Sequence, residues 1–333
     1  MQINKQINKQ INKMIAAAAV LLMLAGCTNA NAVVVTTPDV TPTSVPTATP
    51  LPTPSPTPLP TTPPEPTPEP YFTEDEQVTS DAESGYWLYT SPTLWVEVNR
   101  IYDEELQVTY LVAEVRCGEG ELVRGGLSVP GKTTGKNVDL YKIAQAYQAV
   151  IAIDGDFLDD NIDKDPKGVI IRDGLVSVDK DDNSSVAFMP DGTMKLFEAG
   201  EVTADELLAQ GVTNSFSFGP VLVQDGVVQD GLDKHRLRKK NPRAAVGMIE
   251  ANHFVLVVVQ GRTPEPTNGM TLLELADVFM DYGCELAYNL DGGASATMAF
   301  MGEHISEYGG TLTGQRPVAD ALMFGTSAQI TGD

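Results

Sequence analysis

Short apolar runs recur along the chain from residue 94 onward, and each has about the length of a β-strand. The runs are rich in β-branched residues and are bounded by glycine or charged residues, which is typical of strands. They cover residues 94–101, 108–115, 122–129, 150–153, 169–171, 244–249, 254–259 and 319–324. This pattern predicts a domain rich in β-sheet.

Apolar residues at helical spacing are fewer. Residues 139–150 have one apolar helix face, and a capping box of Thr203 and Glu206 begins a second helix. A third helix, residues 271–283, begins with another capping box and carries an apolar face. Together with the strands, these segments predict an α+β fold with a mixed β-sheet and few helices, in a single domain.

The third helix joins the apolar run 254–259 to a second run, residues 285–290. Strand, helix and strand in this order predict a β-α-β unit whose two strands are parallel neighbours. The motif Asp291-Gly292-Gly293 follows the second strand, at the carboxyl edge where open sheets bind ligands. An Asp-Gly pair between apolar segments is also a strong hairpin-turn signal, so the pattern leaves a turn and a site open.

The first 70 residues differ from the rest in composition. Residues 1–27 place three lysine-bearing QINK repeats before an apolar run too short to span a membrane, which predicts a secretory signal peptide. The run ends in Leu-Ala-Gly-Cys27, which resembles a bacterial lipobox and predicts lipidation of Cys27. An ordinary signal peptide with an incidental cysteine is the alternative. Residues 28–70, rich in proline and threonine, predict a disordered, extended spacer.

We therefore expect residues 71–333 to form a domain that is exported and anchored by lipid to the outer face of the bacterial membrane. The 333 residues contain 22 Lys and Arg against 45 Asp and Glu, a formal charge of -23. Such a domain repels nucleic acid and anionic lipid, so we expect no nucleic-acid partner and membrane contact through the anchor only. Cys117 and Cys284 are compatible either with a disulfide or with two separate thiols. The oligomeric state is not predicted.

Charged residues stand directly beside several predicted strands. Asp154 and Asp156 flank a glycine after the strand 150–153, where two carboxylates can coordinate a hard cation, act as acid and base, or form a solvated turn. Arginines border three apolar segments and offer a planar fork that fits phosphate, although pairing with internal carboxylates is the alternative. The sequence contains no Gly-x-Ser-x-Gly elbow, Walker loop or His-Glu-x-x-His motif, which argues against those hydrolase classes.

Six segments together resemble the phosphodiester glycosidase family, and their order and spacing agree with it over about residues 145–326. The segments are FGPVLV at 218–223, RAAVG at 243–247, VVVQGR at 257–262, GMTLLELA at 269–276, GCELAYNLDGG at 283–293 and RPVADAL at 316–322. The resemblance implies an α+β fold and a glycosidase that hydrolyses a sugar 1-phosphodiester at the anomeric carbon. Glycan phosphodiesters of the cell surface or of exopolysaccharides are the substrates expected on this basis.

The resemblance also implies roles for individual residues. Asp291 lies in the family's Asn-Leu-Asp-Gly-Gly signature, and its recurrent arginines correspond to Arg243, Arg262 and Arg316. The arginines are expected to bind the phosphodiester and offset the charge that grows on it. At Asp154-Gly155 the family usually has Asn-Gly, and the following residue is often small where this chain has Asp156. These departures from the family pattern leave the roles of Asp154 and Asp156 open.

A carboxylate near the oxocarbenium-like sugar is needed for such hydrolysis. We expect Asp291 to act as nucleophile, charge stabiliser or base, with Asp154 or Asp156 as its partner. Gly292 and Gly293 are expected to let the backbone approach the sugar. Hydrogen bonds to the sugar are expected from two hydroxyl groups, those of Ser295 and Thr297.

Three alternatives remain open at the sequence level. A Ca²⁺ or Mg²⁺ ion bound by Asp154, Asp156 and Asp291 is one, since hard cations prefer carboxylate ligands. A non-catalytic surface module that binds phosphorylated glycans is the second, motivated by the aspartate at position 154. The third is a metal-dependent phosphodiesterase that cuts the P–O bond instead of the C–O bond.

Overall fold

The computed structural model of the protein describes residues 71–158, 165–261, 269–306 and 316–332. All of these residues belong to the compact unit Pro66–Asp333. The predicted signal peptide, the Pro/Thr-rich spacer, Cys27 and Arg262 lie outside the described residues. Within the described ranges, no helix has the length and apolar character needed to cross a membrane.

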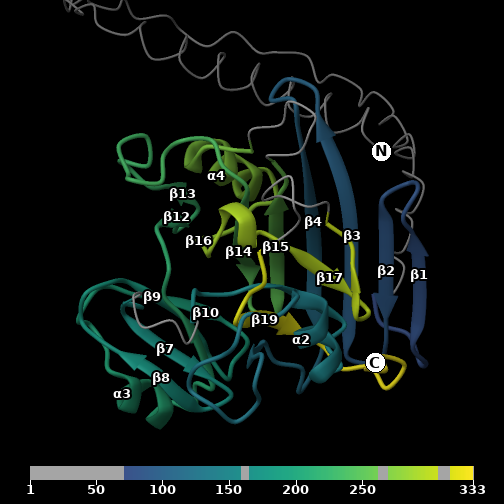
Figure 1. Ribbon diagram of the computed structural model, residues 1–333, viewed down its shortest axis with the longest axis horizontal. Coiled ribbons are helices and arrows are strands. Elements are labelled where there is room, and N and C mark those ends of the chain that lie inside the picture. Colours follow the sequence, from purple (N-terminus) through teal and green to yellow (C-terminus); the bar gives the residue numbers. More distant parts are fainter. Residues whose placement is uncertain (1–70, 159–164, 262–268, 307–315, 333) are drawn as a thin grey trace, which may run out of the picture. The chain divides into compact units, whose positions relative to one another are not determined.

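The largest element is a nine-stranded antiparallel sheet with the order β1-β2-β3-β4-β15-β14-β16-β12-β13 (Figure 1). Its strands are β1 (Gln77–Asp81), β2 (Tyr86–Thr90), β3 (Leu94–Asp103), β4 (Val108–Cys117), β12 (Val221–Gln224), β13 (Val227–Val228), β14 (Arg243–Glu250), β15 (His253–Val259) and β16 (Leu286–Asn289). The central strand β15 is buried at every position, which explains the unbroken apolar sequence of residues 254–259.

Two five-stranded sheets complete the β-structure, in the orders β10-β9-β11-β7-β8 and β18-β17-β6-β19-β5. The first contains β7 (Val169–Arg172), β8 (Leu175–Asp179), β9 (Ser185–Phe188), β10 (Met194–Phe197) and β11 (Asn214–Phe216). The second contains β5 (Arg124–Leu127), β6 (Ile151–Asp154), β17 (Met298–Phe300), β18 (Glu303–His304) and β19 (Asp320–Phe324). Every strand pair within the described residues is antiparallel.

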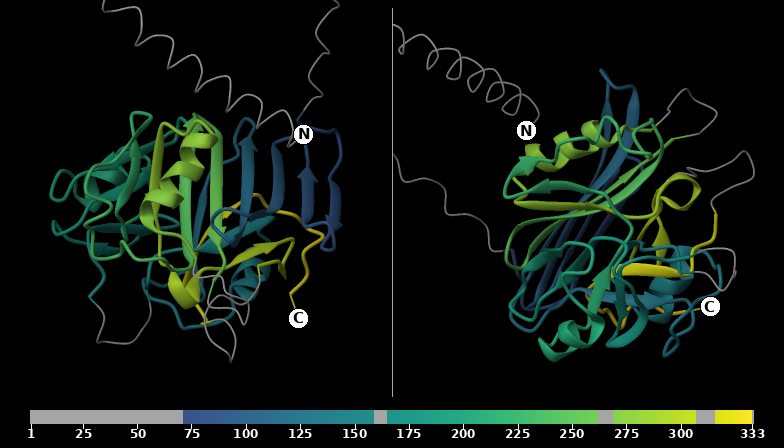
Figure 2. Two further views of the ribbon diagram at one scale, coloured as in Figure 1. Left: turned by 90° about the horizontal axis from the view of Figure 1, so that it is seen from above. Right: turned by 90° about the vertical axis from the view of Figure 1, so that its left-hand side faces the viewer.

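The two faces of the nine-stranded sheet have different partners (Figure 2). Helix α4 (Leu272–Asp281) packs on one face, where Leu275 and Phe279 join a core with alternate residues of β15 such as Val257. The other face forms the main core with the smaller sheets, through residues such as Leu256 and Ile153. Two shorter helices, α2 (Leu140–Ala146) and α3 (Ala204–Ala209), each cover one of the smaller sheets.

These elements confirm a fold that is mostly β-sheet with few helices, but the predicted pairing of the β-α-β unit is wrong. Strand β14 lies between β15 and β16 and pairs with both in antiparallel register. The two strands therefore run parallel without being neighbours. Their carboxyl ends still lie at the same edge of the sheet, with the first residue of β14, Arg243, between them.

The two cysteines of this domain do not form a disulfide. Both are free and buried, Cys117 in the main core and Cys284 in the core beneath α4. Burial raises the pKa of each thiol to about 12, so both stay protonated at neutral pH.

Candidate active site

The candidate site forms where the carboxyl edge of the large sheet meets the end of β6. The residues that follow β16 and those that follow β6 are joined directly, since the backbone N–H of Asp291 donates to the carbonyl of Gly155 at 3.0 Å. The structure therefore brings together the two aspartate-glycine segments that the sequence placed about 140 residues apart. Asp291 begins a site-facing loop here, and a simple hairpin turn is excluded.

The glycines of this loop are required by contacts within the chain. Gly293 has a positive φ of 65°, and its N–H donates to the carbonyl of Pro242 at 2.9 Å. A Cβ atom at Gly292 would lie 2.8 Å from the same carbonyl oxygen, closer than real Cβ contacts allow. The close backbone approach predicted for Gly292 and Gly293 thus serves the packing against Pro242. An approach to a sugar stays a prediction.

Arg316 and Asp291 form the solvent-facing part of the site. The arginine Nη2 lies 2.5 Å from Asp291 Oδ2, and its Nε donates to Ser295 Oγ at 2.8 Å. The Arg316 side chain is 39% exposed and that of Asp291 12%, so a ligand in solvent can reach this pair. The guanidinium also lies over the ring of Phe157, 4.6 Å from its centroid.

Two opposing influences act on the ionisation of Asp291. Burial raises the pKa of its carboxyl group, while Arg316 and hydrogen bonds from Ser295 and the backbone of Gly292 act to lower it. Burial outweighs the ion pair, so the net effect is a raised pKa for Asp291.

Asp154 lies behind Asp291 and is only 1% exposed. Its Oδ1 accepts a hydrogen bond from the backbone N–H of Thr297 at 3.0 Å, whereas its Oδ2 is buried and has no partner among the described residues. Burial, reinforced by the nearby charge of Asp291, raises the pKa of Asp154 well above its usual range. Asp154 thus favours its protonated form more than an exposed aspartate does, and it lies beside an ion-paired aspartate. Environments that differ in this way can assign acid and base roles to two carboxyls.

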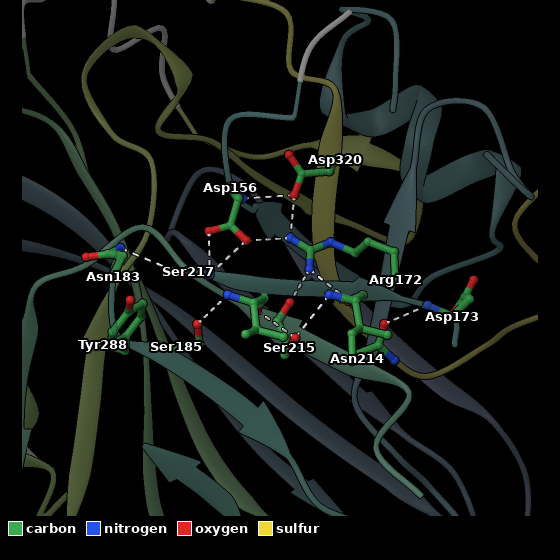
Figure 3. Close-up of polar contacts among 12 residues, drawn as sticks. Asp156, Arg172, Asp173, Asn183, Ser185, Asn214, Ser215, Ser217, Tyr288 and Asp320 are labelled. Carbon is green, nitrogen blue, oxygen red and sulfur yellow. Dashed lines mark hydrogen bonds and ion pairs between the residues drawn. The ribbon is translucent and has the colours of Figure 1, made fainter. Parts of the chain in front are cut away.

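Asp156 is committed to a different cluster (Figure 3). Its carboxylate accepts from the backbone N–H of Ser217 and pairs with Arg172 Nη2 at 2.8 Å. The same Nη2 lies 2.7 Å from Asp320 Oδ2, which also accepts from the backbone N–H of Asp156. All three side chains are at most 2% exposed. We call Asp156, Arg172 and Asp320 the buried ion cluster.

Arg172 and Asp320 are site residues that no sequence motif predicted. Each is a charged residue at the end of an otherwise apolar strand, β7 for the arginine and β19 for the aspartate. Charges are rarely buried without a partner, so such positions signal a buried ion pair. That signal does not reveal which residues pair, because the two strands belong to different sheets.

Asp320 makes the buried ion cluster sensitive to pH. Burial and the neighbouring Asp156 raise the pKa of Asp320 to about 7, against the opposing effect of Arg172. The ordinary pKa of an aspartate is 3.8, and we take this value for Asp320 in the unfolded state. Between pH 3.8 and about 7, the Asp320 carboxyl therefore keeps its proton in the folded state and releases it in the unfolded state. This contribution to stability is complete below the unfolded pKa and is lost as the pH rises through the folded pKa.

The variant Asp320→Asn should flatten this pH dependence, because the amide cannot release a proton. We expect the free energy of unfolding of the wild type to fall from pH 4.5 to 7.5 more steeply than that of the variant, measured by urea denaturation. Asp233→Asn, on an exposed turn, is the control and should keep the wild-type slope. Equal slopes for Asp320→Asn and wild type would contradict the assignment.

The three carboxylates considered for a metal ion do not form a metal site. Both oxygens of the Asp156 carboxylate are already bonded, to Arg172 and to the backbone N–H of Ser217. Among the described residues, no group of three or more His, Cys, Asp or Glu side chains is arranged to hold a metal ion. A Ca²⁺ or Mg²⁺ ion bound by these three aspartates is therefore not supported by their geometry.

The other predicted substrate-binding residues lie deeper than expected. Arg243 is 3% exposed and donates to the carbonyls of Leu237, Lys239 and Met270, at 2.6, 2.6 and 3.1 Å. Burial lowers the pKa of this arginine to about 10. Its observed contacts hold the chain at the edge of the site, and contact with phosphate stays a prediction.

The two hydroxyl residues of the site are buried as well. Ser295 is 1% exposed and accepts from Arg316, so it orients the arginine. Thr297 is fully buried, with its Oγ1 3.1 Å from His304 Nε2 and 3.3 Å from Ser306 Oγ. Neither hydroxyl faces solvent in this structure, and their contact with a sugar stays a prediction.

Comparison with known proteins places this geometry in a family. The family model of phosphodiester glycosidases matches residues 147–325, more than half of the chain. A Bacillus subtilis (strain 168) relative, the SPbeta prophage-derived uncharacterized protein YomE, is 33% identical over 162 residues. That match covers 46% of this chain and 25% of the relative's length.

A solved structure shares the fold. The catalytic domain of zebrafish N-acetylglucosamine-1-phosphodiester alpha-N-acetylglucosaminidase, auto-inhibited by its pro-peptide, superposes with a TM-score of 0.56 at 20% identity. The superposition covers 76% of this chain and 88% of the zebrafish chain. Asp291, Arg316 and the buried ion cluster all lie within the segment that the family model matches. The chain belongs to the phosphodiester glycosidase family.

Proposed function

We propose that this domain hydrolyses the glycosidic C–O bond of a sugar 1-phosphodiester. One observation carries the proposal: a solvent-accessible arginine, Arg316, holds the motif carboxylate Asp291 beside Asp154, a buried carboxyl group whose pKa is raised. An anion-binding group to hold the phosphate and a carboxylate to face the cationic sugar carbon are the groups that this reaction needs. Membership of the phosphodiester glycosidase family supports the same reaction type.

Arg316 is the group best placed to bind the phosphodiester. Its guanidinium is partly exposed, and its orientation is fixed by Asp291, Ser295 and the ring of Phe157. A preorganised cation stabilises the negative charge that grows on the phosphate as the C–O bond breaks. Little protonation of the leaving group is required, because a phosphate ester is already a good leaving group.

Asp291 supplies the negative charge that the cationic sugar carbon needs. The anomeric C–O bond breaks, its electron pair leaves with the phosphomonoester, and water supplies the hydroxyl group that completes the sugar. Asp154 is a better partner for this carboxylate than Asp156, because both oxygens of Asp156 are already bonded to Ser217 and Arg172. The buried Oδ2 of Asp154, by contrast, has no partner among the described residues.

The proposed cellular substrate rests on the predicted signal peptide, lipidation site and spacer of the N-terminal segment. An exported, lipid-anchored enzyme with a spacer of more than 40 residues would act outside the membrane, on glycan phosphodiesters of the cell surface or of exopolysaccharides. This part of the proposal depends on residues 1–70 alone. Labelling with a radioactive fatty acid tests it, since Cys27→Ser should abolish incorporation and release the protein from the membrane.

The reaction is tested with the purified protein and the methyl phosphodiester of N-acetylglucosamine 1-phosphate in ¹⁸O-labelled water. Cleavage of the C–O bond places the label in the free sugar. Label in the phosphate would instead support the alternative phosphodiesterase, and the effect of a chelator would then be measured. Saturable binding without turnover, for this and other sugar phosphodiesters, would support the alternative of a phosphoglycan-binding surface module.

The variant Arg316→Lys tests the role of the arginine. Lysine keeps the charge but cannot hold Asp291 and Ser295 with a planar fork. Losing one charge-assisted hydrogen bond costs about 1.5–3 kcal/mol, so we expect kcat/KM to fall roughly 10- to 100-fold. Arg238→Lys, at an exposed position, is the matched control. Steady-state kinetics within twofold of wild type would show that a point charge at position 316 is sufficient.

A further inference from the structure

Three polar side chains form a hydrogen-bonded cluster next to Asp154, and the proposed reaction does not use them. They are Thr297, His304 and Ser306, which we call the His304 cluster. The imidazole Nε2 of His304 lies 3.1 Å from Thr297 Oγ1 and 3.0 Å from Ser306 Oγ, and the two hydroxyl oxygens are 3.3 Å apart. A single ring nitrogen therefore joins both hydroxyl groups.

A β-hairpin sets the position of His304. Strands β17 and β18 pair in antiparallel register, with Ala299 opposite His304. Both residues of the turn between them, Met301 and Gly302, have a positive φ, 51° and 76°, as in the type I′ turns of two-residue hairpins. Thr297 precedes Ala299 by two residues, so both side chains point to the same face and Thr297 lies within diagonal reach of the imidazole.

Ser306 ties the His304 cluster to the backbone of β17. Its Oγ accepts from the backbone N–H of Met298 at 3.0 Å, and the N–H of Ile305 donates to the carbonyl of Met298 at 3.1 Å. Ser306 is 5% exposed and Thr297 is fully buried. Buried hydroxyl groups are costly when they lose a hydrogen-bond partner, so the imidazole restrains the position of both residues.

Thr297 links the His304 cluster to Asp154. Its backbone N–H donates to Asp154 Oδ1 at 3.0 Å, whereas Oδ2 has no partner among the described residues. This hydrogen bond acts to lower the pKa of Asp154, against the larger opposing effect of burial. The orientation of the carboxyl group therefore depends on where the backbone of Thr297 is held, and the His304 cluster holds it through the side chain.

We propose that His304 is a positioning residue of the candidate site: its imidazole holds the hydroxyl groups of Thr297 and Ser306 and thereby fixes the backbone N–H that orients the Asp154 carboxyl. His304 touches no substrate and takes no part in bond cleavage. The inference rests on the proposed function, in which Asp154 is the partner of Asp291. It deepens that function by naming a residue that acts on the site through another residue.

Two substitutions at position 304 separate positioning from packing. His304→Leu keeps much of the bulk and removes the polar atoms, whereas His304→Gln places an amide group near the position of Nε2. Misplacing a reacting group by about 1 Å can cost about 10²-fold, so we expect His304→Leu to lower kcat about 10- to 100-fold on the methyl phosphodiester of N-acetylglucosamine 1-phosphate. KM should change little, because Arg316 keeps its contacts, and His304→Gln should retain most of the activity. Glu303→Gln, at the neighbouring exposed position of β18, is the control.

A second measurement needs no turnover. The ¹³C NMR signal of the Asp154 carboxyl, assigned by its absence in Asp154→Asn, reports its ionisation as the pH is changed. Loss of the hydrogen bond from Thr297 should raise the pKa of Asp154 further in His304→Leu and leave it unchanged in His304→Gln. Thr297→Val removes the hydroxyl group but keeps the N–H, and it should raise the pKa in the same way. This variant also covers the case in which His304→Leu does not fold.

The pKa of Asp154 decides the inference. A rise in His304→Leu and Thr297→Val that is absent from His304→Gln supports the positioning role. An unchanged pKa in the first two variants, or an equal rise in His304→Gln, would overturn it whatever the activity. If the wild type does not cleave the sugar phosphodiester, the proposed function fails, and the same titration still decides the role of His304. A raised pKa with unaltered kcat would support the positioning role and remove Asp154 from the proposed reaction.

Discussion

Replacing Asp291 by asparagine is expected to lower kcat by about 10³-fold, in the middle of the 10²–10⁴-fold range typical of acid–base groups. Asparagine keeps the shape of the side chain, and its carbonyl oxygen can still accept from Arg316. The substitution therefore removes the negative charge while leaving the loop in place. Steady-state kinetics with the sugar phosphodiester measures the loss, and thermal unfolding checks that the variant is folded.

The matched control is Asp233→Asn, which makes the same change on an exposed turn and should leave kcat unaltered. Activity of Asp291→Asn above about a tenth of wild type would place the essential carboxylate elsewhere, because even a weakly contributing acid–base group supplies about 10²-fold. Asp154→Asn would then be the next variant to measure.

The second large effect is expected in stability. Replacing Arg172 by methionine leaves Asp156 and Asp320 buried without their only cationic partner among the described residues. Breaking a buried ion pair by removing one partner typically costs about 3–5 kcal/mol, so we expect a loss of that size in the free energy of unfolding. Denaturation in urea at pH 7.5 measures this loss. At that pH, Asp156 and Asp320 of the variant must either take up a proton or stay charged without a cationic partner.

Neutralising the remaining carboxyls should restore much of this loss. The triple variant Arg172→Met, Asp156→Asn, Asp320→Asn removes all three charges, and such replacements of a buried ion cluster are often nearly neutral. Arg238→Met, at an exposed position, is the control and should change stability by less than about 0.5 kcal/mol. A loss below 1 kcal/mol in Arg172→Met would show that the cluster contributes little to stability.

Local patterns in the sequence predicted much of the fold. Both capping boxes are confirmed, at Thr203 with Glu206 and at Thr271 with Glu274. Each of the eight apolar runs overlaps a strand. These features depend on residues within one turn of helix or along one strand, so the sequence carries the information directly.

Strand order and buried partners depend on contacts between distant segments. The position of β14 between β15 and β16 follows from the packing of the whole sheet, and no periodicity within these strands records it. The buried ion cluster also depends on contacts between distant segments, because it joins residues of two sheets and of the loop after β6. The sequence therefore did not predict it. Family resemblance identified Asp291 and Arg316, and the structure placed them in contact. The sequence did not predict that Arg243 is buried, with its side chain donating to backbone carbonyls.

The excess of aspartates over arginines at the site affects substrate binding and product release differently. The aspartates of the site outnumber its arginines: they are Asp154, Asp156, Asp291 and Asp320, against Arg172 and Arg316. Of the two arginines, only Arg316 reaches solvent. A phosphodiester enters with a single negative charge, whereas a phosphomonoester carries about -1.5 to -2 at pH 7. On the proposed reaction, the Asp291 carboxylate therefore repels the product more strongly than the substrate. This repulsion would favour release of the phosphomonoester and limit inhibition by phosphorylated products.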